Sequence, residues 1–127
     1  MIALVGTFPS QEYVKEVARD WFERREYLVH LTDEGLFHAR SPGNEEVWAV
    51  RCLAGEEDEC IFDAAIGRVL KEQRSEATHF AVAAPDVSWV HHQISRIDPS
   101  IRDFLRIRFL LVDMDGNLRT GAPQLDE

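Results

Sequence analysis

The chain is poor in the residues that cross-link or anchor small proteins. Only two of its 127 residues are cysteines, Cys52 and Cys60, and neither belongs to a CxxC pair or a zinc spacing. A disulfide between them is possible but not needed, since free thiols are usual in a reducing compartment. No apolar run approaches the roughly 18 residues that a membrane span requires. The opening MIALVG has no basic lead-in and is too short for a signal peptide, so we predict a cytoplasmic protein without a membrane partner.

Positive charge is also scarce. Fourteen Lys and Arg stand against 23 Asp and Glu, which gives a formal net charge of −9. Proteins that bind nucleic acid usually cluster basic side chains against the phosphates, so the charge disfavours a nucleic-acid partner without excluding one. We interpret the local basic patch as a solvated face; it consists of Arg96, Arg102, Arg106 and Arg108.

Apolar segments alternate with turn and capping residues along the whole chain, which predicts a single domain over residues 1–127. We expect one helix, a three-strand meander, a second helix, a strand, a third helix and a last strand, followed by a frayed tail at 121–127. Ser10, Asp58 and Asp86 are the predicted N-caps of the three helices. The expected segments are a short strand at 2–5, a helix at 11–26, strands at 27–32, 36–40 and 47–53, a helix around 61–73, a strand at 79–84, a helix around 86–99, a helical turn at 101–105 and a strand at 107–112.

Two connections decide the fold class. The segments 47–53 and 79–84 are separated by one amphipathic helix, which predicts a right-handed crossover and therefore adjacent parallel strands. The run 79–84 lacks polar alternation, so we expect it to be covered on both faces. The fold class is thus α/β (α+β), with a mixed sheet flanked by helices. Asp113 to Asn117 predicts a hairpin turn.

This order resembles the αβββαβ core of the PD-(D/E)XK superfamily, the group of restriction enzymes and Holliday-junction resolvases. The resemblance covers residues 11–85. The small residues of AAIGRVL (64–70) are similar to a helix that carries a glutamine in that family, with Arg68 in its place. The run that ends in AAP at Pro85 resembles a family strand that often ends in proline. The resemblance implies a restriction endonuclease-like core over about residues 11–112.

The resemblance also implies where chemistry would lie. In active members, an acid of the second strand and an acid of the third strand bind a divalent metal, and a lysine two residues later helps to activate water. The third-strand pair falls here on Ala49 and Arg51, or on Arg51 and Leu53, and neither pair has a carboxylate. The second-strand acid would fall near Gly35 or Leu36.

The sequence therefore predicts no catalytic residue, no cofactor and no metal site in the family positions. If carboxylates have moved, the candidate Mg²⁺ ligands are Asp33 and Glu34. The catalytic candidates are then Asp33, Glu34, Glu46 and Arg51. Arg51 shares a strand face with apolar neighbours, so we expect it to be partly buried and paired with Glu12 or Glu16.

Three hypotheses about function follow. The first is a non-catalytic restriction endonuclease-like domain that acts by protein binding or self-association. The second is a divergent metal-dependent nuclease with relocated carboxylates. The third is an acidic immunity-type inhibitor of a basic partner, which the net charge favours through electrostatic complementarity.

Overall fold

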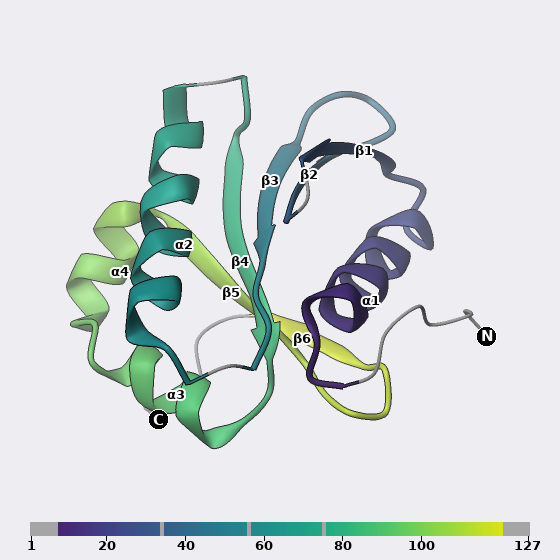
Figure 1. The fold of residues 1–127 in the computed structure, drawn as a ribbon. Helices are drawn as coiled ribbons and strands as arrows, with labels where there is room; N and C mark the ends of the chain where they lie inside the picture. Colours follow the sequence, from purple (N-terminus) through teal and green to yellow (C-terminus); the bar gives the residue numbers. More distant parts are fainter. Residues whose placement is uncertain (1–7, 34, 56, 75, 121–127) are drawn as a thin grey trace.

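A six-stranded mixed sheet organises the protein (Figure 1). The computed structural model describes residues 8–33, 35–55, 57–74 and 76–120. The strand expected at 2–5, the tail at 121–127 and Glu34 lie outside the described residues. The strands are β1 (Leu28–Asp33), β2 (Leu36–Arg40), β3 (Val47–Cys52), β4 (His79–Pro85), β5 (Ile107–Val112) and β6 (Leu118–Thr120). The helices are α1 (Gln11–Glu23), α2 (Glu59–Lys71), the short 3-10 helix η1 (Glu72–Arg74), α3 (Ser88–Ser95) and α4 (Pro99–Leu105).

The strands lie in the sheet in the same order as in the sequence. β1, β2 and β3 form the predicted antiparallel meander, and β6 pairs antiparallel with β5. β3 and β4 are parallel neighbours, with Trp48 opposite His79 and Cys52 opposite Ala83, so the predicted crossover is confirmed. β4 and β5 are parallel as well. The α/β class with a mixed sheet is therefore confirmed.

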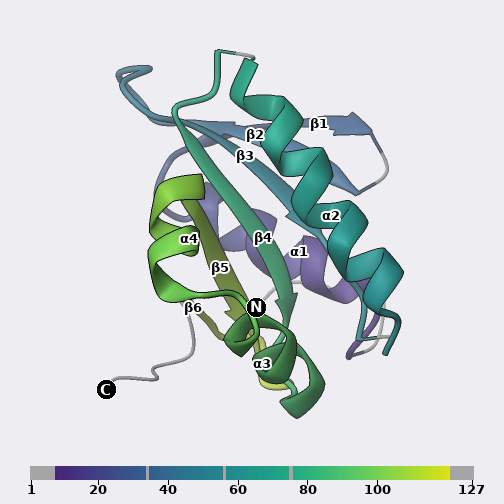
Figure 2. The same cartoon turned by 90° about the vertical axis from the view of Figure 1, so that its left-hand side faces the viewer.

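Helices cover the sheet on two sides, α1 on one and α2, α3 and α4 on the other (Figure 1 and Figure 2). Both parallel crossovers step in the same direction, and right-handed connections then place their helices on one face. Each face has its own apolar core. Phe22 and Trp48 belong to the α1 side, and Phe62 and Phe109 to the other. β4 is buried on both sides, as its apolar run predicted.

Helix α1 begins as expected and ends early. The Ser10 side chain accepts a hydrogen bond from the Tyr13 N–H, which is the predicted N-cap. The helix stops at Glu23 rather than at Glu26, because Glu26 takes a φ of 67°, a left-handed conformation that no helix continues through. The predicted end was therefore wrong by one turn.

The region after β4 departs most from prediction. Asp58 caps α2 through its carboxylate, as expected. Asp86 does not cap α3, whose N-cap residue is Val87 without a side-chain hydrogen bond. Pro99 does not end α3 either. That helix stops at Ser95, and Pro99 opens α4, since a proline has no N–H to leave unsatisfied in the first turn.

The predicted hairpin turn joins β5 to β6. The Asp113 carboxylate accepts hydrogen bonds from the N–H groups of Asp115 and Asn117, and Gly116 supplies a φ of 82°. The short strand β6 was not expected. Both cysteines are free thiols, and burial raises the pKa of Cys52 to about 12. Within the described ranges, no helix combines the length and apolar character needed to cross a membrane.

Candidate functional site

The α2-facing side of β2 and β3 is the surface where the family resemblance would place metal chemistry. Cross-strand pairing puts Leu36 opposite Arg51 and His38 opposite Ala49, and directly opposed residues share a face. Ala49 is fully buried there, under the Phe62 side of α2. If the resemblance holds, a buried methyl group stands where active members have a metal-binding carboxylate.

Arg51 is half-buried at the end of this face, beside Gly35. A Cβ atom on Gly35 would lie 2.7 Å from Nη1 of Arg51 and 2.7 Å from Nε2 of Gln11, so the glycine keeps room for both side chains. Gln11 Nε2 donates to the carbonyl of Cys52 at 2.9 Å. The partial burial of Arg51 agrees with expectation.

The two acids expected to pair with Arg51 are engaged on their own helix. Glu12 contacts Lys15 at 3.2 Å, and Glu16 contacts Arg19 at 2.8 Å. Three-residue spacing brings such side chains together along one helix face. In the structure both carboxylates therefore form ion pairs with basic side chains of α1 itself.

Glu46, a candidate catalytic acid, holds aromatic side chains. Its Oε1 accepts hydrogen bonds from the hydroxyl of Tyr27 at 2.7 Å and from the indole N–H of Trp48 at 2.9 Å. The Trp48 and Tyr27 hydrogen bonds hold the pKa of Glu46 below its ordinary value. Glu46 therefore anchors the start of β3 and the residue before β1. Asp33 ends β1, one residue before the undescribed Glu34.

This anchoring predicts a pH-dependent stability. Because the pKa of Glu46 is depressed on folding, its contribution is present above the ordinary value of 4.5 and is lost as pH falls through the lower folded value. We expect Glu46→Gln to cost about 1 kcal/mol of unfolding free energy at neutral pH, since charge-assisted bonds become neutral ones. The difference in unfolding free energy between Glu46→Gln and the parent protein should disappear as pH falls below 4.5. Urea unfolding across this pH range measures it, with Glu45→Gln at the exposed neighbour as control. Equal pH profiles for both variants would contradict the assignment.

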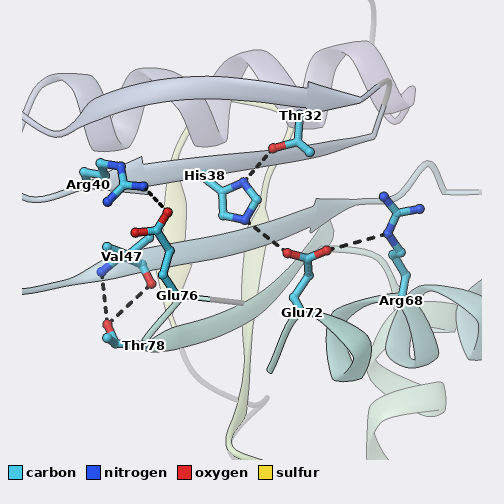
Figure 3. Close-up of polar contacts among 8 residues, drawn as sticks. All are labelled: Thr32, His38, Arg40, Val47, Arg68, Glu72, Glu76 and Thr78. Atoms are coloured by element: carbon cyan, nitrogen blue, oxygen red, sulfur yellow. Dashed lines mark hydrogen bonds and ion pairs between the residues drawn. The ribbon is translucent and has the colours of Figure 1, made fainter. Parts of the chain in front are cut away.

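His38 is the centre of the polar contacts on the α2-facing side (Figure 3). Its Nδ1 lies 2.5 Å from the hydroxyl oxygen of Thr32, and its Nε2 lies 3.1 Å from Oε1 of Glu72. Arg68 of α2 approaches the other oxygen of Glu72 at 4.0 Å. The side chains of His38 and Glu72 are 18% and 17% exposed, so the contact is largely sheltered from water.

The sequence of hydroxyl, imidazole and carboxylate determines which ring nitrogen of His38 donates a hydrogen bond and which accepts one. An ionised carboxylate only accepts, so Nε2 of His38 donates to Glu72. Nδ1 then accepts from the Thr32 hydroxyl when the ring is neutral. Both ring nitrogens of His38 are thus occupied by hydrogen bonds to Thr32 and Glu72. A neighbouring ion pair also joins separate parts of the chain: Arg40 of β2 binds Glu76, which precedes β4, at 2.6 Å.

Together these contacts tie η1, which directly follows α2, and the segment before β4 to the meander. Thr78 accepts from the Val47 N–H at 3.0 Å, and Figure 3 shows this bond beside the Arg40–Glu76 pair. Sequence reasoning missed the group because Glu72 is 34 residues from His38, and no local spacing marks it.

A second polar cluster lies at the carboxyl end of β4. Asp86 accepts from His91 and, at 3.2 Å, from Nε of Arg119. Burial pushes the pKa of Asp86 upward, but the hydrogen bonds from His91 and Arg119 outweigh it, and the pKa lies below its ordinary value. The cluster fastens α3 and β6 to the end of β4, which explains why Asp86 does not cap α3.

The basic patch predicted from the sequence is divided between two faces. Arg96 pairs with Glu59 of α2, whereas Arg108 lies 5.9 Å from the Trp48 ring in the core on the α1 side. Among the described residues, no three His, Cys, Asp or Glu side chains converge on a position that would hold a metal ion. No family model and no curated protein matches this chain.

Proposed function

We propose that the protein is a non-catalytic domain with a restriction endonuclease-like core, and that it acts by self-association through strand β1. Two features support the non-catalytic part. Ala49 and Arg51 replace the family's metal-binding acid and lysine, and Glu46 and Glu72 are committed to bonds that hold elements together. What remains available for function is a binding surface.

The edge strand β1 is the observation that carries the proposal. β1 forms one edge of the sheet, and its outer backbone groups face away from β2. Leu28 is 72% exposed and Leu31 is 45% exposed. Proteins that avoid edge pairing place lysine or proline on such strands or keep them very short. β6, the opposite edge, has three residues, whereas β1 has six and contains neither lysine nor proline.

The β1 sequence is suited to pairing with a second copy. A two-fold axis at His30 sets two β1 strands antiparallel, with Val29 opposite Leu31 of the second copy and the reverse. Both residues lie on the α1 side, because Leu31 pairs with the core residue Phe37. Apart from Asp33 at its end, the strand has no carboxylate, so two chains of net charge −9 bring few like charges together at this edge.

Sedimentation velocity tests this proposal, and we expect a dimer to form between about 5 and about 500 µM, the range of a small, reversible interface. Leu28→Lys should keep the protein monomeric, since an edge lysine opposes strand pairing. Met114→Lys is the matched control, because it adds the same charge at a side chain 69% exposed in the β5–β6 turn.

Three results would overturn the proposal. One is a monomer at every concentration. Another is a dimer that Phe104→Ser on α4, but not Leu28→Lys, dissociates; Phe104 is 81% exposed and offers a different surface. The third is metal-dependent DNA cleavage by the pure protein, which would establish the nuclease alternative.

A further inference from the structure

His30 lies near the centre of the exposed edge strand β1. Its cross-strand neighbour is His38 in β2, so the two imidazoles share the α2-facing side of the sheet. The His38 ring is largely sheltered, and hydrogen bonds to Thr32 and Glu72 occupy its two nitrogens. His30, in contrast, is exposed. An ion that reaches this edge from solvent therefore meets the imidazole of His30.

The two-fold axis proposed for self-association passes beside this residue. Two antiparallel β1 strands paired about His30 set the imidazoles of the two copies directly opposite each other, on one face of the joined sheet. Side chains opposed in this way have Cβ atoms about 4.5–5.5 Å apart. Zinc–nitrogen bonds are about 2.0–2.1 Å long, so two rings at this separation can bind one ion. The site needs both copies and therefore rests on the proposed self-association.

The side chains around the paired imidazoles decide which ion fits. On the same face, the strand pairing sets Leu28 of each copy opposite Thr32 of the other. The segment from Leu28 to Thr32 has no carboxylate. Mg²⁺ and Ca²⁺ need oxygen ligands, mainly carboxylates, whereas imidazole nitrogen suits Zn²⁺, Ni²⁺ and Cu²⁺. A divalent cation also offsets part of the repulsion between two chains of net charge −9.

We infer that one Zn²⁺ ion joins two copies of the chain at the β1 edge, bound by His30 of each copy. Water completes the tetrahedral coordination, and the exposed Leu28 side chains flank the ion. Because the ion needs a ligand from both copies, it binds the dimer and not the monomer, and Zn²⁺ shifts the equilibrium toward the dimer. The metal regulates self-association and supplies no chemistry.

Sedimentation velocity over a range of protein concentrations tests this inference, with full-length protein in Zn²⁺, in Mg²⁺ and in EDTA. Free Zn²⁺ at about ten times its dissociation constant should raise the association constant about tenfold, as expected for an ion that binds only the dimer. Mg²⁺ and EDTA should give the same, lower constant. In ¹H–¹⁵N spectra of labelled protein, the His30 ring should shift saturably, at a Zn²⁺ concentration that falls as the protein concentration rises.

The ratio of the association constant in Zn²⁺ to that in EDTA separates the ion from the strand pairing. His30→Ala should reduce this ratio from about ten to about one, because the ligands are removed from both copies. His92→Ala is the matched control, since it removes an exposed imidazole from α3, and it should leave the ratio unchanged.

The possible failures distinguish the zinc site from the self-association. A dimer that Leu28→Lys dissociates, but whose ratio is one, would overturn this inference and leave self-association through β1 standing. A ratio that His30→Ala does not change would place the ion elsewhere on the protein and would overturn the inference as well. A monomer in both Zn²⁺ and EDTA would overturn the zinc site and the proposed function together.

Discussion

Phe22→Ala is expected to lower the free energy of unfolding by about 3–5 kcal/mol, the range for removing a buried aromatic ring from a well-packed core. Phe22 is fully buried on the inner face of α1. Its ring centroid lies 5.2 Å from that of Tyr27, 5.9 Å from that of Phe37 and 5.5 Å from that of Trp48. The ring therefore joins α1 to the meander, and no single neighbour can fill the space it leaves.

Equilibrium unfolding in guanidinium chloride measures this loss. Phe104→Ala is the matched control, since the same atoms are removed from a side chain that is 81% exposed. Exposed substitutions of this kind change stability by about 0.5 kcal/mol or less. Similar midpoints for the two variants would show that the aromatic cluster does not stabilise the fold as its geometry indicates. A loss of about 4 kcal/mol is a large part of the 5–15 kcal/mol that holds a typical domain folded.

Strands and caps were predictable where their signals are local. The predicted bounds of β2 coincide with the observed strand, because the segment LFHAR lies between two turn sequences. Ser10 and Asp58 cap helices as predicted, since a cap needs only the next turn of chain. Asp86 also has the residue type and position of an N-cap, but its carboxylate binds Arg119, which is 33 residues away in the sequence. A distant ion pair replaced a local cap, and no local pattern reports such a pair.

The candidate site was less predictable for a similar reason. Strand periodicity assigned residues 47, 49, 51 and 53 to one face, but β3 lies centrally in the sheet and is buried on both faces, from Trp48 on one to Ala49 on the other. Alternation of apolar and polar residues identifies the core face of a strand only where the other face is exposed to solvent. The partners of His38 come from β1 and from η1, so only the folded chain brings them together.

The buried methyl group of Ala49 gives the sharpest test of whether β3 can accommodate a metal-binding carboxylate. Ala49 is fully buried, opposite His38 in β2 and Phe80 in β4, and it packs in the core that includes Phe62. Ala49→Asp introduces an acid at the position where the proposed family core would carry one. We expect it to destabilise the protein by more than about 3 kcal/mol at neutral pH, because a carboxylate enters an apolar layer without a free partner.

The pH dependence of this loss distinguishes a buried charge from mere crowding. Burial raises the pKa of a carboxyl group in the folded state, so the penalty is small below the unfolded value of about 3.9 and grows as pH rises through it. Ala64→Asp, at an exposed position of α2, should cost about 0.7 kcal/mol or less, the loss of helix propensity. If Ala49→Asp is instead as stable as the parent protein and gains stability on addition of Mn²⁺, the β3 position still accommodates a metal, and the nuclease alternative is favoured over the non-catalytic one.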